Sequence, residues 1–345
     1  MEFDILVATR NRQSVLEISL PLMISQEILP SKFIFIDSSD DHLLLRRTVE
    51  RIFNEFSPAS NIQIIRSAPG LARQRNCGLR YTRAPVIFFP DDDALWFRGM
   101  ARAVMSIYER DSREVIGAVC PADSPAPPPE APNIVTSSHD GSGGIFNALG
   151  KLMNRFEDRF LMDPIYIEGF SRNAGRTAPE WLPEEDAEVF GPMTGFQMSF
   201  RTDVIRMYGF DESLGRYSLF EDRDASLSVL KERLIVCTKK GRVFHFRVPG
   251  KRTDDFEWGI INMLNRAYVV CKHSAPGSEA RRKLNGYCLF RLAVYLLRAR
   301  SQPGRQRIRG AWKAMACFPR LVNTPQSELT GCFVQLREEC LKGRI

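Results

Sequence analysis

Residues 69–94 read PGLARQRNCGLRYTRAPVIFFPDDDA, and this stretch decides the fold class. Its first part, 70–83, has the pattern of a short helix, and the apolar run at 84–89 has the length of a buried strand. Three consecutive aspartates, 91–93, come directly after that strand. Because ligands of open α/β sheets bind at the carboxyl ends of the strands, this pattern predicts an acidic binding edge.

Short apolar runs alternate with helical segments over the first 120 residues, which is typical of βα units around a mostly parallel sheet. The expected strands are residues 3–8, 32–36, 61–65, 84–89 and 115–120. The expected helices are residues 12–26, which Pro21 is expected to kink or divide, and residues 42–56, 70–83 and 97–110. We therefore expect the α/β fold class, with a Rossmann-like, mostly parallel sheet flanked by helices.

The composition changes at Pro121. Residues 121–132 are rich in proline and residues 137–144 in glycine and serine, so neither segment is expected to form regular structure. We expect an insertion over about 121–190. The ordered segments expected after it are 193–214, a helix near 220–234, strands at 234–237 and 242–246, and helices over 256–318.

Composition excludes several classes of protein. Of the 345 residues, 44% are apolar and 26% are charged, so the chain can bury a core and is not a disordered one. The apolar run 287–297 is interrupted by Arg291 and is shorter than the ~18 residues that a membrane span needs. The first residues carry no secretion signal, so we expect a cytoplasmic protein. The eight cysteines form no CxxC pair, and we expect reduced thiols.

Positive charge is concentrated in the last part of the chain. Residues 281–345 hold 14 Lys and Arg against three Glu, or +11, whereas residues 1–280 hold 34 against 38 acids, or −4. This distribution argues against nucleic acid as a partner and predicts a basic C-terminal face. A basic amphipathic helix around Arg291 and Arg298 can lie on an anionic membrane surface. A helical subdomain with solvated arginines explains the same pattern equally well.

The aspartate triplet has two interpretations. Asp91, Asp92 and Asp93 repel one another unless a cation is present. Carboxylate oxygens select Mg²⁺ or Mn²⁺, which is usually shared between one or two carboxylates and the phosphates of a substrate. The alternative is a charged loop that caps the next helix.

Polar side chains end two other predicted strands at the same edge. Thr9 and Arg10 follow the first strand, and Asp37 ends the second. A carboxylate at a strand end suits hydrogen bonding to a base or a ribose hydroxyl, but Thr9 and Asp37 could equally be N-caps of the following helices. Arg73 and Arg75, near a helix start, suit phosphate, or they are ordinary solvated helix charges.

Several motifs occur in a characteristic order. They are VATRNR (7–12), FIFIDSSDD (33–41), the stretch 69–94, GPMTGFQMSFR (191–201), GFDESL (209–214), SLFEDRDASL (218–227) and GRVFHFRVPGKR (241–252). Together they resemble the family 2 glycosyltransferases, whose catalytic domain has the GT-A fold. The resemblance covers roughly 1–255, interrupted by the insertion. It implies a nucleotide-sugar donor bound over the carboxyl edge of the sheet, and transfer of the sugar to an acceptor with inversion at the anomeric carbon.

The resemblance places part of the donor on the first two strands. It implies that Thr9, Arg10 and Asp37 contact the nucleoside, with Arg73 beside them or near the diphosphate. The second strand ends in IDSSD instead of the commoner DDxS arrangement, so the nucleoside contact is expected to differ in detail.

The resemblance also makes the aspartates a DxD-type element. Asp93 is then the first choice for the metal ligand, and Asp91 or Asp92 contacts the ribose or a metal-bound water. His245 corresponds to a position where many relatives place another metal ligand. The alternative for a lone histidine among aromatic residues is a core position. The expected cofactor is Mn²⁺ or Mg²⁺, which would stabilise the charge that develops on the diphosphate.

An inverting transfer needs a general base opposite the leaving group. Glu221 and Asp222 match the ED element of the family, which implies Asp222 as the base and Glu221 as the residue that orients the site or the acceptor. The alternative is that these acids simply begin a helix, and both can be true. Phe196, in the stretch that resembles the floor of the donor and acceptor site, is a stacking platform or a core aromatic.

We therefore expect a GT-A catalytic domain at 1–255, with the insertion as an acceptor-side loop or lid, and a basic helical region at 256–345. The expected activity is metal-dependent transfer from a UDP-sugar to a saccharide or a lipid-linked saccharide, at the inner face of a membrane. A QxxRW motif and membrane helices are missing, which favours a single addition over polymerisation. A nucleotidyltransferase would need a glycine-rich loop after the first strand, and an inactive membrane-surface scaffold would not be expected to keep every acid.

Overall fold

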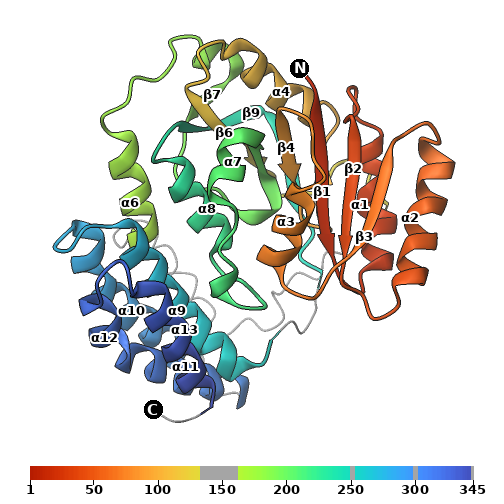
Figure 1. Ribbon diagram of the computed structural model, residues 1–345. Helices are drawn as coiled ribbons and strands as arrows, with labels where there is room; N and C mark the ends of the chain where they lie inside the picture. The colour runs from red at the N-terminus through yellow and green to blue at the C-terminus, as the bar shows by residue number, and fades with distance from the viewer. Residues whose placement is uncertain (133–161, 249–252, 298–301, 343–345) are drawn as a thin grey trace. The chain divides into compact units, whose positions relative to one another are not determined.

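The structure is a computed structural model that describes residues 1–132, 162–248, 253–297 and 302–342 (Figure 1). The chain divides into two compact units. Unit 1 comprises residues 1–136, 172–212 and 221–249, and unit 2 comprises residues 137–171, 213–220 and 250–345. Part of the expected insertion, residues 133–161, lies outside the described residues.

A central sheet organises unit 1. In the described residues its strands are β1 (Phe3–Thr9), β2 (Lys32–Asp37), β3 (Ile62–Arg66), β4 (Val86–Phe89), β5 (Ala94–Trp96), β6 (Ile116–Asp123), β7 (Ala187–Val189), β8 (Met198–Arg201) and β9 (Leu234–His245). They follow the order β3-β2-β1-β4-β8-β6-β9-β5, and β7 also pairs with β9. Strands β1, β2, β3, β4, β6 and β9 run in one direction, and β5, β7 and β8 run in the other. The expected α/β fold with a mostly parallel sheet is confirmed.

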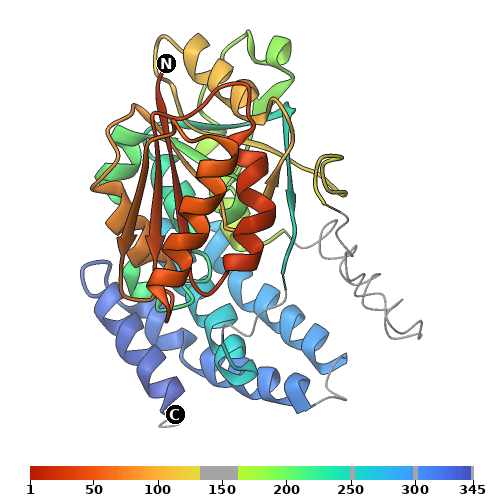
Figure 2. The ribbon, with the colours of Figure 1, turned by 90° about the vertical axis from the view of Figure 1, so that its right-hand side faces the viewer.

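Helices cover both faces of this sheet. They are α1 (Gln13–Ile24), α2 (His42–Phe56), α3 (Leu71–Leu79), α4 (Met100–Arg110), α7 (Thr202–Tyr208) and α8 (Glu221–Val229). Helices α1 and α2 lie side by side on one face (Figure 2). Because side chains alternate along a strand, Ile5 and Val7 of β1 join the core cluster that includes Leu16 of α1, whereas Leu6 points to the other face, toward α3. A Cβ on Gly78 would overlap Leu6, so glycine lets α3 approach the sheet.

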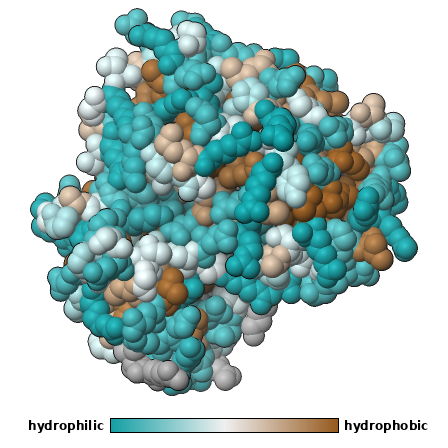
Figure 3. Space-filling view, in the orientation of Figure 1, coloured by the Kyte–Doolittle hydropathy of each residue, from teal (hydrophilic) through white to brown (hydrophobic). Residues whose placement is uncertain are grey.

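Strand β3 forms one edge of the sheet, and its residues are only half-buried. Apolar side chains gather over this end of the sheet on the face drawn in Figure 3. The half-exposed apolar face is consistent with an edge strand that is covered on one side only.

The structure differs from the sequence-based expectations at several places. Strand β6 continues to Asp123, so regular structure extends into the proline-rich segment 121–132 that was expected to be irregular. Helix α1 continues through Pro21 to Ile24, so the proline does not divide it. The two strands expected at 234–237 and 242–246 are one strand, β9, because a bulge absorbs the residues between Thr238 and Arg242 while pairing with β6 continues. Strand β5, directly after the aspartates, was not expected because three residues give no periodic signal.

Unit 2 is helical in its described part. Besides the first residues of α6 (Pro164–Asn173), it contains α9 (Asp255–His273), α10 (Glu279–Leu297), α11 (Gln302–Ala316), α12 (Phe318–Asn323) and α13 (Leu329–Leu341). Helix α9 contacts each of the four helices that follow it. A Cβ on Gly259 would overlap the carbonyl oxygen of Arg307, and a Cβ on Gly310 would overlap that of Phe256, so two glycines let the backbones of α9 and α11 touch.

Two further expectations can be checked against the structure. All eight cysteines are free thiols, as expected. Among the described residues, no helix has both the length and the apolar character that crossing a bilayer requires.

Candidate functional site

The three aspartates form a turn between β4 and β5. The backbone N–H of Ala94 donates to the carbonyl oxygen of Asp91 at 3.1 Å, which closes the turn. In the antiparallel pairing of β5 with β9, Ala94 lies opposite His245, and the N–H of Phe246 donates to the carbonyl oxygen of Asp93 at 3.1 Å. The register of these two strands therefore places His245 beside the aspartate turn.

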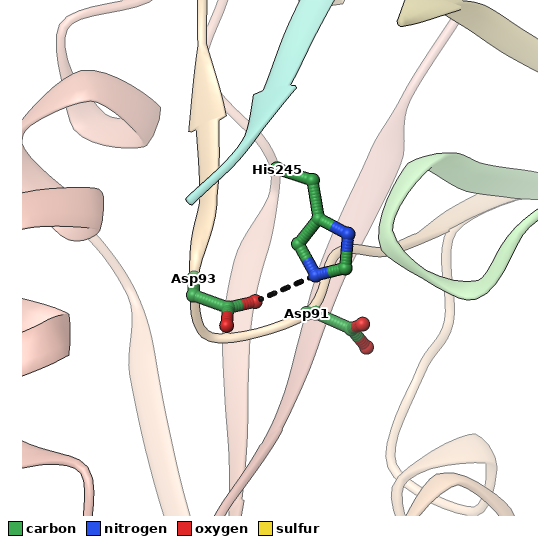
Figure 4. Close-up of side chains that lie close together, drawn as sticks. All are labelled: Asp91, Asp93 and His245. Carbon is green, nitrogen blue, oxygen red and sulfur yellow. Dashed lines mark ion pairs between the residues drawn. The ribbon is translucent and has the colours of Figure 1, made fainter. Parts of the chain in front are cut away.

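Asp91, Asp93 and His245 form a cluster that can hold a metal ion. One ligand atom from each residue lies within 4.8 Å of the others. Figure 4 shows the imidazole directed toward the two carboxylates, and its Nε2 lies 3.3 Å from Oδ1 of Asp93. Asp93 is buried and the other two side chains are about a fifth to a quarter exposed, so the cluster is open on one side. The two carboxylates suit Mn²⁺ or Mg²⁺, and the imidazole, a ligand typical of transition metals, favours Mn²⁺ of the two.

Phe196 supports the histidine of this cluster. Its ring stacks on the imidazole of His245, with ring centroids 4.5 Å apart and an angle of 15° between the planes. Phe196 is itself buried. Of the two alternatives for this residue, the geometry therefore gives a buried aromatic that stacks on a protein side chain.

Asp92 lies outside this cluster and points back toward β1. Its Oδ2 accepts a hydrogen bond from the hydroxyl of Thr9 at 2.9 Å, and its Oδ1 lies 3.7 Å from Nε of Arg12. The same guanidinium lies 3.6 Å from Oδ2 of Asp93. Arg12, which the sequence did not single out, thus contributes positive charge to the aspartate turn.

The N-cap alternative for Thr9 and Asp37 is wrong. The N-cap position of α1 is Arg12, and that of α2 is Asp41, whose carboxylate accepts from the N–H of Leu44 at 2.9 Å. Both predicted caps instead lie at the ends of their strands, three or more residues before the helix.

Asp37 is fully buried at the end of β2. Its Oδ2 lies 2.6 Å from Nδ1 of His42, and its Oδ1 accepts from the N–H of Ser39 at 2.8 Å. Arg10, at the end of β1, donates to Asp40 at 3.1 Å on the surface. A carboxylate held this firmly keeps a fixed position at the sheet edge.

A pocket of about 650 Å³ opens beside these residues. It is lined by the residues that follow β2 and β3, namely Ser38, Ser39, Asp40, Arg66, Ser67, Ala68 and Pro69. Arg73 is more than half exposed at the surface and pairs with Glu212 at 3.3 Å.

The predicted acid pair begins α8. Glu221 and Asp222 are both buried, and Oδ2 of Asp222 accepts from the N–H of Gly195 at 2.9 Å. Burial, followed by repulsion from Asp222, raises the pKa of Glu221 to about 8, and the nearby Arg75 guanidinium opposes this rise. The acids also occupy the first turn of the helix, so the structural interpretation holds together with the functional one.

Arg75 joins the acid pair to the aspartate turn. One of its terminal nitrogens donates to Glu221, and the other donates to Asp91 at 2.9 Å and to the carbonyl oxygen of Gly195 at 3.2 Å. The guanidinium lies over the ring of Phe210, 5.3 Å from its centroid. Arg75 therefore connects Asp91 of the metal cluster with Glu221 directly, and with Asp222 through Gly195.

The sequence argument named Arg73 and Arg75 together as suited to phosphate and carried only Arg73 into the donor site. A usable signal existed, because Arg75 shares the buried face of α3 with Gly78 and Leu79 at spacings of three and four residues. Arg73 lies on the exposed face of the same helix.

Comparisons with known proteins match the chain in sequence and in fold. Residues 4–174 match the family model described as glycosyl transferase family 2. The structure is similar to that of residues 1–349 of TarS from S. aureus, at 12% identity and a TM-score of 0.53, covering 99% of this chain and 92% of that one. TarS 1–349 in complex with UDP-GlcNAc gives the same values. The mannosyltransferase PcManGT from Pyrobaculum calidifontis, in complex with GDP-Man and Mn²⁺, is 15% identical at a TM-score of 0.53, covering 100% of this chain and 88% of that one. No curated protein sequence matches the chain.

Proposed function

We propose that this glycosyltransferase, with its glycosyl transferase family 2 domain at residues 4–174 and its GT-A fold, transfers a sugar from a UDP-linked donor. The proposed acceptor is a saccharide, and the proposed transfer inverts the anomeric carbon. The observation that carries this proposal is the arrangement at the sheet edge. A cluster that can hold a divalent cation and a buried acid pair share Arg75 as a partner, and Gly195 links Arg75 to Asp222. An inverting transfer needs both groups, at opposite ends of the reacting bond.

Asp91, Asp93 and His245 are the residues that would hold the cation. The carboxylate oxygens match the ligands of both Mn²⁺ and Mg²⁺, and the imidazole nitrogen favours Mn²⁺. A divalent cation bound there offsets the negative charge that develops on the diphosphate leaving group. The solved complex of PcManGT with GDP-Man and Mn²⁺ supports this cofactor.

The pocket after β2 and β3 is the proposed nucleoside site. Its serines and backbone groups suit the hydrogen bonds of a base and a ribose, and Asp37 lies buried directly before it. Thr9 and Arg10 remain proposed contacts of the nucleoside. Arg73 remains a proposed contact near the diphosphate. The complex of TarS with UDP-GlcNAc supports a uridine nucleotide as donor.

Asp222 is the proposed general base. Its carboxylate is held by the N–H of Gly195 at 2.9 Å and by the N–H of Arg223 at 2.8 Å, which fix its orientation. In this proposal Asp222 accepts the proton of the acceptor hydroxyl as that oxygen attacks the anomeric carbon. Glu221 would orient the site from its bond to Arg75.

A lipid-linked acceptor and an anionic membrane surface complete the proposal. Helix α11 contains no acid and exposes Arg305, Arg309 and Trp312, which are spaced four and three residues apart on one helix face. Leu289 and Leu296, seven residues apart on α10, are also more than half exposed. Over the C-terminal helices, the face drawn in Figure 3 is mostly hydrophilic with separate apolar patches. Exposed tryptophan, leucine and arginine without acids suit an anionic interface.

A thermal-shift panel tests the donor and the metal together. UDP-, GDP- and dTDP-sugars are each added with and without Mn²⁺, because a ligand of the folded state raises the melting temperature. We expect the largest shift with a UDP-sugar plus Mn²⁺, followed by transfer to a saccharide acceptor with inverted anomeric configuration by NMR. A folded protein that binds nucleotide sugar and never transfers or hydrolyses it would support the inactive scaffold instead.

Sedimentation with vesicles tests the membrane part. We expect binding to vesicles that contain anionic lipid and none to neutral ones, and loss of binding in the double variant Arg305→Gln, Arg309→Gln. Trp312→Ser is expected to weaken the binding, and Met207→Ser, which changes an equally exposed apolar residue of unit 1, is its matched control. Equal binding to neutral vesicles, or none to either, would end this part of the proposal.

A further inference from the structure

Two arginines of unit 1 are almost completely buried and differ in what surrounds them. Arg75 contacts Asp91 and Glu221 and lies over Phe210. Arg201 pairs with Asp111 at 3.2 Å and lies over Tyr108, 5.4 Å from its centroid. Each position therefore buries a guanidinium beside a carboxylate and an aromatic ring, so Arg201 can serve as a reference for Arg75.

The partners of the two arginines have different consequences. Arg201 donates to the carbonyl oxygens of Ile116 at 3.0 Å and Asp111 at 3.1 Å, so it ties the start of β6 to the loop before it. Arg75 donates only to groups of the candidate site, namely one carboxylate of the metal cluster, one of the acid pair and the carbonyl of Gly195. Burying an excess of carboxylates around one cation costs stability and is typical of functional sites.

Geometry explains why this position suits arginine. The guanidinium is planar and presents its N–H groups in a rigid fork, so two carboxylates bound to its two ends are held at a fixed separation. Its third bond reaches Gly195, whose N–H holds Asp222. A lysine carries the same charge on a single ammonium and cannot reproduce this fork.

We propose that Arg75 is a positioning residue that fixes the metal cluster and the acid pair relative to each other. It acts through Asp91 on the cation and through Glu221 and Gly195 on Asp222, and it touches neither the sugar nor the acceptor. The proposal rests on the proposed function, because it assigns the geometry of that site to one side chain.

The test compares Arg75→Lys with Arg201→Lys and Arg80→Gln in the whole 345-residue chain. We expect Arg75→Lys to keep a melting temperature near that of the wild type, to lower kcat by about 100-fold with a small change in KM for the donor, and to weaken binding of Mn²⁺ alone by about 10-fold. Arg201→Lys should lower the melting temperature and leave kcat and the binding of Mn²⁺ near their wild-type values. Arg80→Gln, at an exposed arginine that caps the C-terminus of the same helix, should change none of the three.

Further measurements make each outcome decisive. Added guanidinium ion is expected to restore part of the activity of Arg75→Ala and none in Arg201→Ala. A fall in melting temperature without a change in kcat or Mn²⁺ binding, or failure of both Arg75→Lys and Arg75→Gln to fold, would show a structural role and overturn the proposal. If the wild type transfers no sugar, the proposed function fails, whereas Mn²⁺ binding still decides whether Arg75 positions the cluster.

Discussion

The sheet edge of unit 1 and the helix crossing of unit 2 use burial for opposite purposes. At the sheet edge, Asp93, Glu221 and Asp222 are buried, and Arg75 contacts both Glu221 and Asp91, whose carboxylate lies near that of Asp93. At the crossing of α9 and α11, Gly259 and Gly310 remove side chains so that two backbones touch. Like charges brought together in a poorly solvated place cost free energy, whereas close packing without voids lowers it.

The comparison teaches where a substitution should appear. Changes at the sheet edge are expected to alter chemistry while leaving the stability of unit 1 equal or higher. Changes at the helix crossing are expected to alter stability and leave donor and metal binding unchanged. Each of the following predictions tests that distinction.

Asp93→Asn is expected to have the largest effect. Loss of a buried metal ligand should lower kcat/KM by about 10³-fold, or ~4 kcal/mol of transition-state stabilisation. The melting temperature should stay equal or rise, because one of the repelling carboxylates is removed. Initial rates with Mn²⁺ and differential scanning calorimetry measure both. Asp203→Asn, at an exposed ion pair with Arg233, is the control, and an unchanged rate in Asp93→Asn would refute the metal role.

Asp222→Asn is expected to lower kcat by about 10²- to 10³-fold with little change in donor KM, because only proton transfer is lost. Asparagine keeps the acceptor oxygen for the N–H of Gly195, so the turn should stay in place. Asp224→Asn, in the same helical turn, is the comparison. Should Asp224→Asn abolish turnover while Asp222→Asn keeps it, the base has been assigned to the wrong residue.

Gly310→Ala tests the helix crossing. Its Cβ would overlap the carbonyl oxygen of Phe256, so α9 and α11 must separate, and we expect a loss of about 1–3 kcal/mol in the free energy of unfolding. Gly286→Ala on α10 is the matched control, because nothing lies within 4 Å of its Cβ, and it should raise stability by up to ~1 kcal/mol. Denaturant titrations followed by circular dichroism compare the two. Equal stability of both variants would mean that the crossing is loosely packed.

The smallest effect concerns pH. The pKa of Glu221 is raised from 4.5 to about 8, so the folded state binds this proton more tightly than the unfolded chain. The contribution to stability is complete below pH 4.5 and is lost as pH rises through about 8. Glu221→Gln cannot lose that proton, and its melting temperature should fall less than that of the wild type between about pH 5 and about pH 9. Parallel curves for the two proteins would contradict the raised pKa.

Local sequence patterns were sufficient for much of the fold. Each of the five strands expected in the first 120 residues is present, because apolar runs bounded by turn residues carry their own signal. The aspartates also lie at the predicted edge, since strand order does not change which end of a parallel strand is its carboxyl end.

The remaining features depend on contacts between distant segments. His245 lies beside Asp93 only because β5 and β9 pair in one register, and nothing near either residue in the sequence encodes that pairing. Arg73 and Arg75 differ by two positions and have the same chemistry, but the turn of α3 buries one and exposes the other. Periodicity along the helix was the missing criterion, because charge alone does not distinguish them.

The continuity of β9 restricts which insertions and deletions this strand can accept. One end of the strand pairs with β6, and the other carries His245 to the aspartate turn across from β5. Because side chains alternate along a strand, gaining or losing one residue between Thr238 and Arg242 would turn the imidazole to the opposite face. The number of residues in this segment must therefore be preserved more strictly than their identity. A single-codon insertion there is expected to weaken metal binding while the chain still folds, and to do so more selectively than a point substitution.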